Sequence, residues 1–582
     1  MKLAVIALDY DGTIAQQDAL DPSVRDAVAD ARTRGIIVML VTGRILDELR
    51  RVAGDLHFVD AVIAENGAVV HFPDSAHTSL VAPAIPEAFV AELRRRGIAM
   101  TPGQCLVDAA AADAPQILEA IREMELPLVL LFNRGRVMIL PQGVSKATGL
   151  QMALTMLRLS PRNTVAVGDA ENDHALLQLA EVGAAVEWGS AALRSAADVT
   201  VTGRGPVAVA EYILSLAGRG RVPVPARARR RLRLGYTEDG REFSLAVRGR
   251  NVLIAGDARS GKSWIAGLLC EQLILHGYSM CVLDVEGDYR SLEALPGVSV
   301  LGGEDPPPTP RDLLRALRYP DRSVVIDLSH MVHEQKIDYI RSVLPALHVM
   351  RRRTGLPHRI LLDEAHYFLH DAAAQHLFDL ETNGYIVVTY CASRLPQELL
   401  AATEVMLVTC ESNPAEIDAL CARCNGCDRV ESARPHWSAI AHLALGHAVA
   451  LPVTEEAGGA LRMFTIGQRL TPHVRHRQKY VDVPVTESRA FQFAPNGAGP
   501  QRARTLRQFV EVLEHASSPA LVSYLKRGDF SRWIADVFGD YALAQEMRAQ
   551  EQRFRTRVDA DVLPEIVGAI RARYDLVEDE MT

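Results

Sequence analysis

The sequence is poor in cysteine, with eight residues among 582. So few cysteines in so long a chain do not form a disulfide framework, and we expect a reducing cytoplasm. No apolar run reaches the length of a membrane span, and the chain starts in a short strand without a signal peptide. We therefore expect a cytoplasmic protein with no membrane partner.

Strong charge of either sign is also missing, because the net charge is −9 at pH 7. The surface as a whole is not that of a protein that binds nucleic acid without selectivity, although local basic runs could contact phosphates. The chain is 48% hydrophobic and 23% charged, which is typical of a globular protein. A length of 582 residues predicts about three domains.

One phosphate-binding motif is present near the middle of the chain. An apolar strand at Val252–Ala255 runs into a loop that fits G-x-x-x-x-G-K-[ST], and a helical pattern follows from Trp264 to Leu275. The glycines let backbone N–H groups face phosphate oxygens, the lysine reaches the β- and γ-phosphates, and the serine hydroxyl can hold Mg²⁺. The sequence therefore predicts an ATP site with Mg²⁺ as cofactor. Its residues are Gly256, Asp257, Ala258, Arg259, Ser260, Gly261, Lys262 and Ser263.

Four short stretches in the first 217 residues place polar groups next to predicted strands and one helix. They contribute Asp9 and Asp11, then Thr42 and Gly43, then Lys146, then Asp169, Asn172 and Asp173. The carboxyl ends of strands in open α/β sheets are where ligands bind. One carboxylate there can attack phosphorus, another can move a proton, and others can hold Mg²⁺.

The order of these four stretches resembles the haloacid dehalogenase superfamily, specifically its Cof-like phosphatases. The resemblance implies a small phosphate ester as substrate, Asp9 as the nucleophile that forms an aspartyl-phosphate, and Asp11 as general acid and then base. It also implies that Thr42, Gly43, Lys146 and Asn172 contact the phosphoryl group, and that Asp9, Asp11, Asp169 and Asp173 form the Mg²⁺ site. A small cap domain is expected at about residues 84–136.

A second set of polar strand ends follows the phosphate loop. The apolar strand Ile360–Leu362 ends in Asp363 and Glu364, about 100 residues after the loop. An aspartate there can bind the Mg²⁺ of a nucleotide through water, and the glutamate can polarise the attacking water. Strands alternate with helical patterns through this region, which predicts a parallel sheet.

This region, with its LDVEGDY stretch at residues 283–289, resembles the HerA/FtsK family of P-loop ATPases. The resemblance implies a RecA-like fold and a homo-oligomer, typically a hexameric ring that moves DNA. The family usually shows Gln-Arg after its late strand, whereas this chain has Tyr390 and Cys391. Arg394, a few positions on, could bridge to the ATP of a neighbouring subunit, or no arginine from this place does.

Several charged or cysteine-rich stretches have two interpretations. The arginine-rich segment 218–232 is an extended linker or a basic arm for nucleic acid. Arg351, Arg352 and Arg353 complement a helix dipole. The basic group at residues 469–479 is a solvated loop or contacts ATP or nucleic acid. Cys421, Cys424 and Cys427, with Cys410, have metal-ligand spacing, but buried free cysteines on a helix are the favoured interpretation.

Taken together, the sequence predicts an α/β protein in four parts. These are a phosphatase-like domain with a Rossmann-like sheet at 1–217, a linker at 218–232, an ATPase domain at 233–486 and a small all-helical domain at 487–582. The first functional hypothesis is a bifunctional Mg²⁺-dependent phosphatase and ring ATPase that serves as a nucleic-acid translocase or as a defence or repair factor. The alternatives are a polynucleotide kinase/phosphatase and a nucleotide-gated assembly platform.

Overall fold

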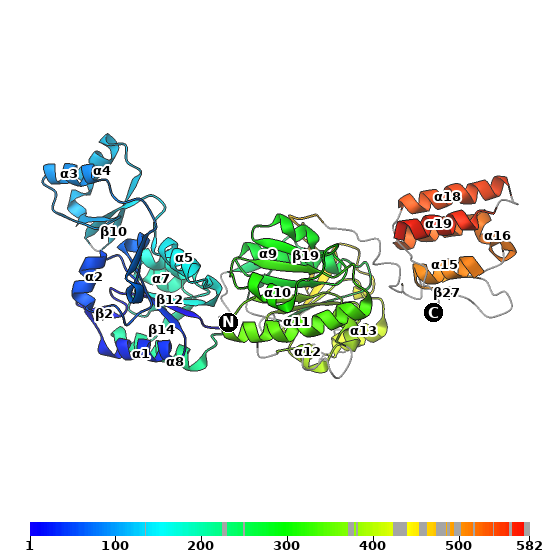
Figure 1. Ribbon diagram of the computed structural model, residues 1–582, viewed down its shortest axis with the longest axis horizontal. Coiled ribbons are helices and arrows are strands. Elements are labelled where there is room, and N and C mark those ends of the chain that lie inside the picture. The colour runs from blue at the N-terminus through cyan, green and yellow to red at the C-terminus, as the bar shows by residue number, and fades with distance from the viewer. Residues whose placement is uncertain are drawn as a thin grey trace.

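Three bodies lie in a row along the long axis of the molecule (Figure 1). The computed structural model describes residues 1–574 with the exception of 134, 224–229, 248–250, 370–376, 380–381, 423–438, 453–461, 473–484, 486–488, 494–501, 516–517, 539–540 and 558–560. The N-terminal body is drawn in blue and cyan, the central one in green and yellow, and the C-terminal one in orange and red.

The N-terminal body is built on an eight-stranded sheet with the order β14-β13-β12-β1-β4-β5-β6-β7. From β14 to β5 neighbouring strands are parallel, whereas β6 and β7 pair antiparallel. Every residue of β1 and β12 is buried, as expected for central strands covered by helices on both faces. The strands are β1 (Val5–Asp9), β4 (Ile37–Val41), β5 (Ala61–Ala64), β6 (Val69–Phe72), β7 (His77–Leu80), β12 (Thr164–Gly168), β13 (Val182–Val186) and β14 (Val199–Val201).

The helices of this body are α1 (Pro22–Thr33), α2 (Leu46–Ala53), α5 (Lys146–Met156), α6 (His174–Leu179), α7 (Ala191–Ala196) and α8 (Gly205–Arg219). A short ladder of β2 (Ala15–Gln16) and β3 (Ala19–Leu20) follows β1. Aliphatic side chains pack on both faces of the sheet in two separate clusters. The sheet is therefore sandwiched between helices, with the carboxyl ends of β1, β4 and β12 at one edge.

A smaller lobe projects from this body between β7 and α5 (Figure 1). Its four-stranded antiparallel sheet has the order β10-β11-β9-β8 and carries two helices. Its own core contains Phe89, Leu93, Ile117 and Ile139. The elements are α3 (Glu87–Arg95), β8 (Met100–Pro102), β9 (Val107–Ala110), α4 (Ala114–Glu123), β10 (Leu128–Asn133) and β11 (Arg136–Pro141).

The central body is built on an eleven-stranded sheet with the order β16-β15-β25-β24-β23-β17-β22-β21-β18-β20-β19. The seven strands from β23 to β19 run parallel, and the four at the other end are antiparallel. The parallel strands are β17 (Val252–Ala255), β18 (Met280–Asp284), β19 (Val298–Gly302), β20 (Ser323–Asp327), β21 (Arg359–Leu362), β22 (Tyr385–Thr389) and β23 (Val405–Val408). The antiparallel strands are β15 (Arg231–Thr237), β16 (Glu242–Ala246), β24 (His447–Pro452) and β25 (Arg462–Ile466).

Helices cover both faces of this sheet, and α9 starts directly after the phosphate loop. They are α9 (Lys262–Leu275), α10 (Pro310–Ala316), α11 (His333–Thr354), α12 (Gln397–Ala401) and α13 (Pro414–Cys421). Among the residues that the structure describes, no helix combines the length and apolarity needed to cross a membrane.

The C-terminal body consists of helices closed by one short strand pair. Phe530, Trp533 and Phe538 lie in its core, together with Phe491 and Phe509. The elements are β26 (Phe491–Gln492), β27 (Arg502–Ala503), α15 (Leu506–His515), α16 (Ser518–Arg527), α17 (Asp529–Trp533), a π-helical turn (Ile534–Phe538), α18 (Tyr541–Thr556) and α19 (Leu563–Tyr574).

Two basic clusters differ from the simplest interpretation of the sequence. Arg351 is buried and donates to the carbonyl oxygens of Pro357 (3.0 Å) and Asn383 (2.6 Å), so it fixes neighbouring loops rather than complementing the helix dipole from solvent. Arg469 forms a fully buried ion pair with Glu271 of α9 at 2.9 Å, so it is neither a solvated residue nor an ATP ligand. Buried pairs of this kind are costly to break. The rest of that basic group, 473–479, lies outside the described residues.

The cysteines are described only in part. Cys410 and Cys421 are each half-buried, and Cys421 is the last residue of α13. Cys424 and Cys427 lie outside the described residues. The linker segment 224–229 also lies outside them.

Candidate functional site

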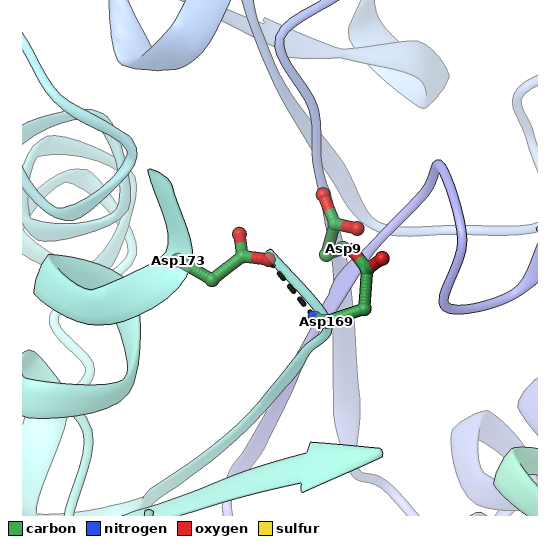
Figure 2. A group of neighbouring side chains, drawn as sticks. All are labelled: Asp9, Asp169 and Asp173. Atoms are coloured by element: carbon green, nitrogen blue, oxygen red, sulfur yellow. Dashed lines mark hydrogen bonds between the residues drawn. The ribbon is translucent and has the colours of Figure 1, made fainter. Parts of the chain in front are cut away.

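Three carboxylates meet at the carboxyl edge of the N-terminal sheet (Figure 2). Asp9 ends β1, Asp169 follows β12, and Asp173 closes the short turn after it. All three are buried, and one oxygen from each lies within 4.8 Å of the others. Gly168 makes this approach possible, because a Cβ there would lie 2.7 Å from the Asp173 carboxyl group.

Lys146 neutralises part of this charge. It is the first residue of α5, which Ser145 caps through the backbone N–H of Thr148. Its buried ε-amino group donates to Asp9 Oδ1 and to Asp173 Oδ1, both at 2.6 Å. These two carboxylates hold the pKa of Lys146 above its ordinary value despite the burial, so the side chain is a permanent cation.

The cluster still carries more negative than positive charge. Burial, followed by the charge of Asp173, raises the pKa of Asp9 well above its ordinary value. Asp173 Oδ2 accepts the backbone N–H of Asp169 at 3.0 Å (Figure 2). It also accepts the backbone N–H of Ala170 at 3.1 Å, and the two bonds fix the carboxylate. Buried oxygen ligands with excess negative charge are what Mg²⁺ requires, so the residues fit this ion.

Asp11 lies apart from that cluster. The Arg44 guanidinium group donates to both oxygens of its carboxylate, from Nε to Oδ2 at 2.9 Å and from Nη2 to Oδ1 at 2.6 Å. Arg44 also donates to Asp18 and lies 5.7 Å from the centre of the Tyr10 ring. The structure therefore does not bring Asp11 together with the three metal-ligand candidates. Arg44 has no role in the motifs found by sequence, although it directly follows Thr42 and Gly43.

The phosphate-binding candidates lie around the cluster. Thr42 is buried after β4, and its hydroxyl oxygen accepts the backbone N–H of Arg44 at 3.1 Å. Asn172 is half-buried beside Asp173. Gly43 faces the smaller lobe, because a Cβ there would lie 3.4 Å from the sulfur of Met138.

The smaller lobe is thus a cap over this edge of the sheet. Ile45, which follows the Gly43 loop, packs with Leu106, Met138 and Leu140 of the lobe. Buried Glu65 accepts the backbone N–H groups of Gln104 (3.0 Å) and Cys105 (2.7 Å). These contacts fix the cap against the sheet.

The central body has its own site at the phosphate loop. Gly256 has φ +145°, and a Cβ there would lie 2.2 Å from the hydroxyl of Thr409, so a side chain does not fit. Lys262 donates to the carbonyl oxygen of Asp257 at 2.8 Å, and Ser260 contacts Thr409 at 2.5 Å. The loop opens α9, whose N-terminal N–H groups favour phosphate.

Acidic residues from neighbouring strands meet this loop. The Ser263 hydroxyl donates to Asp288 at 2.6 Å, so the structure adds Asp288 to the candidates for Mg²⁺ binding. Asp284 shapes the turn, because its carboxylate accepts the N–H groups of Gly287 (2.7 Å) and Tyr289 (2.9 Å). Both residues belong to the LDVEGDY stretch, which the sequence marked without assigning these roles.

Asp363 and Glu364 follow β21 at the same edge. The strands β17 and β21 run parallel with β22 between them, so the loop and the acidic pair share one edge of the sheet. Both residues are buried, and the Tyr289 hydroxyl donates to Asp363 at 3.4 Å. Glu364 has φ 44° and ψ 46°, a left-handed conformation that is unusual outside glycine and often found at functional sites.

The two arginines predicted for the ATP site have other surroundings. Arg259 donates to the backbone carbonyls of Val537 and Phe538 in the C-terminal body. Arg394 is exposed on the short turn after β22. Exposure of Arg394 is compatible with a contact to another subunit, but within this chain it is not among the residues gathered at the phosphate loop.

In the comparisons with known proteins, one family matches the N-terminal body and another matches the central body. The family described as haloacid dehalogenase-like hydrolase matches residues 6–95 and 98–213, and the central domain of helicase HerA matches residues 246–342. The phosphoglycolate phosphatase of Methanopyrus kandleri is 31% identical over 230 residues, covering 37% of this chain and 97% of that relative. The phosphoglycolate phosphatase of Natronomonas pharaonis is 31% identical over 214 residues, covering 34% and 90%.

A solved haloacid dehalogenase-like hydrolase from Bacteroides thetaiotaomicron is 18% identical, covers 37% of this chain and all of that protein (100%), and has a TM-score of 0.33. The family matches confirm both resemblances seen in the sequence.

Proposed function

This chain belongs, through residues 6–213, to the haloacid dehalogenase-like hydrolases, and from that membership we propose that its N-terminal body is a Mg²⁺-dependent phosphatase for a small phosphate ester. One observation carries the proposal: buried Lys146 lies between Asp9 and Asp173 at the sheet edge, with Asp169 beside them. Two relatives of similar length to this body are named phosphoglycolate phosphatases, which makes phosphoglycolate the first substrate to test.

In the proposed reaction, the Asp9 carboxylate attacks phosphorus while the bond from phosphorus to the alcohol oxygen breaks. Asp11, which Arg44 orients, gives its proton to the leaving oxygen and later takes one from water. That water attacks the aspartyl-phosphate, which frees inorganic phosphate and restores the Asp9 carboxylate. Lys146 and Thr42, with the backbone of Gly43, hold the phosphoryl oxygens. Asp9, Asp169 and Asp173 would hold Mg²⁺, which offsets charge on the phosphoryl group when bound.

The test of this assignment is hydrolysis of phosphoglycolate and p-nitrophenyl phosphate by the full-length protein, with Mg²⁺ and with EDTA. Asp9→Asn removes the nucleophile, and we expect at least about a thousandfold loss of kcat. Asp74→Asn is the control, since that aspartate is exposed on the same body. Phosphatase activity that survives Asp9→Asn would show that the nucleophile is another residue.

For the central body we infer an ATPase related to HerA, which assembles with copies of itself, as a hexameric ring, and acts on DNA. Support comes from the phosphate loop, from Asp363 and Glu364 at the same sheet edge, and from the HerA match at residues 246–342. In this assignment Ser263, Asp288 and Asp363 lie where a nucleotide's Mg²⁺ would be held, and Glu364 orients the attacking water. Arg394 reaches the ATP of the next subunit. The location of the protein is proposed to be cytoplasmic.

Glu364→Gln tests the water-orienting role. The variant keeps the size of the side chain but not its charge, so we expect ATP to bind normally while turnover falls about a hundredfold or more. Glu398→Gln is the control, because Glu398 is exposed on α12. Unchanged turnover in Glu364→Gln would remove this residue from the mechanism.

Two further measurements separate the alternatives. Transfer of label from ATP to a DNA 5′-hydroxyl would favour the polynucleotide kinase, which needs an acid that activates a hydroxyl rather than one that orients water. Particle size with and without ATP and DNA tests the ring: a monomer under every condition contradicts it. A closed multimer that binds ATP without turning it over would favour the assembly platform.

A further inference from the structure

A cavity of about 490 Å³ lies between the N-terminal and central bodies, far from the edges that carry the two catalytic sites. The N-terminal body lines it with Lys2, Arg162 and Arg221, and the central body lines it with Arg359, Asn383 and Glu404, among others. A volume of this size is in the range of small-molecule binding sites, which often form between domains.

Buried contacts hold the two walls of the cavity together. The Tyr278 hydroxyl donates to both carboxylate oxygens of Glu181 at 2.9 Å, across the boundary between the bodies. His358 Nε2 lies 3.1 Å from Asn163 Oδ1, and both side chains are buried. At Gly355 an added Cβ would lie 2.5 Å from the Asn163 amide nitrogen, so the backbone and this side chain are in close contact. The cavity is therefore a defined part of the fold.

Arg359 is the most deeply buried of the cavity's cationic side chains that have no hydrogen-bonded counter-ion among the described residues. It is 6% exposed, and within the described ranges its guanidinium group makes no hydrogen bond or ion pair. Its guanidinium carbon lies 5.5 Å from the centre of the Tyr278 ring, and the carboxylates of Glu181 and Glu404 line the same cavity. Burial lowers the pKa of Arg359, and the charges of Tyr278, Glu181 and Glu404, which act in the opposite direction, do not offset it.

The other arginines on the cavity wall behave differently. Arg162 donates to Glu181 at 3.2 Å and to the carbonyl of Leu179 at 2.8 Å, and Arg351 is saturated by backbone carbonyls. Lys2 and Arg221 are half-buried, and their side chains make no hydrogen bond or ion pair to the part of the chain that the structure describes. Glu404 accepts from the Asn383 amide at 3.2 Å. The cavity wall therefore carries more positive than negative charge, and three of its cationic side chains have no hydrogen-bonded counter-ion among the described residues.

We propose that this interdomain cavity binds a small phosphate ester, with the phosphate on Arg359, Arg221 and Lys2 and the organic part toward Asn383 and Thr382. A guanidinium group has a fork of N–H donors that matches phosphate oxygens, and a charge-assisted bond of this kind is among the strong ones. The amide and hydroxyl groups on the opposite wall suit an organic part with hydroxyl groups. Binding here does not depend on the proposed activities.

The site is separate from both catalytic edges because it lies at the other ends of the strands. Lys2 precedes β1, Asn163 precedes β12, and Arg359 is the first residue of β21. The same three strands lead to Asp9, Asp169 and Asp363. A strand of five residues spans about 17 Å, so a bound ester would touch neither catalytic centre. It would instead contact the starts of strands that lead to both.

The test uses inorganic phosphate as the probe, in equilibrium dialysis against the full-length chain with EDTA present. All samples carry Lys262→Ala, which removes the cation of the phosphate loop. Without divalent cations, the carboxylates of Asp9, Asp169 and Asp173 repel phosphate at the other catalytic site. We expect about one phosphate to bind per chain, and Arg359→Gln to weaken binding by about tenfold or more.

Arg221→Gln provides the second variant, because its side chain is less buried and its loss should not disturb folding. We expect a weakening of about threefold to tenfold for this variant. Arg241→Gln is the matched control, since that arginine is exposed on the turn between β15 and β16. If thermal unfolding shows that Arg359→Gln does not fold, the phosphate affinity of Arg221→Gln tests the proposal.

Two results would overturn the proposal: no phosphate bound by the parent, or equal affinity in the Arg359, Arg221 and Arg241 variants. The assay works with both catalytic sites disabled, so either result leaves the proposed phosphatase and ATPase activities untouched.

Discussion

The two candidate phosphate sites of this chain contain the same types of residue, but their lysines have different partners. Each has a lysine at the start of a helix and carboxylates at the ends of parallel strands. In the N-terminal body the ε-amino group of Lys146 is bound to Asp9 and Asp173 at 2.6 Å. In the central body Lys262 donates to the carbonyl of Asp257 in its own loop, at 2.8 Å. The first lysine is part of a buried charge network, whereas the second lies against its loop where a phosphate can attract it.

The surroundings of the two sites differ in the same sense. The cap covers the first site through Met138 and Ile45, and it belongs to the same body. The phosphate loop instead meets a separate part of the chain, because Arg259 donates to carbonyls of the C-terminal body. The comparison indicates a preorganised site under a cap in the N-terminal body and a site in contact with a separate part of the chain in the central body.

The largest expected effect is a difference in the free energy of unfolding between variants of the two lysines. Lys146→Ala leaves Asp9 and Asp173 buried without their cation, so we expect the free energy of unfolding of the N-terminal body to fall by about 3–5 kcal/mol in EDTA. Mg²⁺ should restore part of it by binding the same carboxylates. Lys262→Ala removes a hydrogen bond to a carbonyl and should cost about 1 kcal/mol. Urea unfolding measures both, and equal losses would contradict the comparison.

A smaller effect is expected from Arg44, which has no counterpart in the other site. Arg44→Gln frees Asp11 from the contacts at 2.6 Å and 2.9 Å, so the proposed general acid loses its orientation. We expect kcat for a phosphate ester to fall about tenfold with little change in KM. Arg50→Gln is the control, because Arg50 is partly exposed and pairs with Asp47 within the same helix, α2. A change in KM alone would show instead that Arg44 binds substrate.

The smallest effect concerns pH at the phosphate loop. Burial, and then the charge of Asp257, raises the pKa of Glu411 to about 8. This carboxyl is neutral below that pH and becomes negative above it, close to where phosphate binds. Nucleotide affinity should therefore decrease about twofold to fivefold between pH 7 and pH 9 from this group.

Glu411→Gln should remove that part of the pH dependence, while exposed Glu398→Gln should leave it in place. Titration with a non-hydrolysable ATP analogue measures the dissociation constant at each pH. A pH profile that stays the same in Glu411→Gln would assign the effect to another group. No matching loss is expected for the phosphatase, where Lys146 keeps its charge throughout this range.

Much of each site could be predicted from the sequence because the signals are local. An apolar strand followed at once by Asp9, by Asp169 or by Asp363 predicts carboxylates at one edge of a parallel sheet, and the structure places them there. The spacing of the phosphate loop likewise predicts backbone geometry, since only glycine fits at Gly256.

Contacts between distant residues could not be predicted in this way. Arg44 and Asp11 are separated by 33 positions, and Arg469 and Glu271 by 198. Asp288 became a candidate Mg²⁺ residue only through its contact with Ser263. Sequence alone shows a charged residue in each case but not the partner that decides its role, which is why Arg469 was misjudged as a solvated or ATP-contacting residue.

The sequence by itself determined which strands are followed by carboxylates, because the residue after a buried strand is fixed by covalent order. Only the tertiary structure decided which charges are compensated. Lys146 reaches Asp173 across 27 positions, and Arg469 meets Glu271 inside the fold, whereas Arg359 lies buried between two bodies without a hydrogen-bonded counter-ion among the described residues. Charge compensation acts over a few ångströms in space regardless of distance along the chain, so it appears only when the chain is folded.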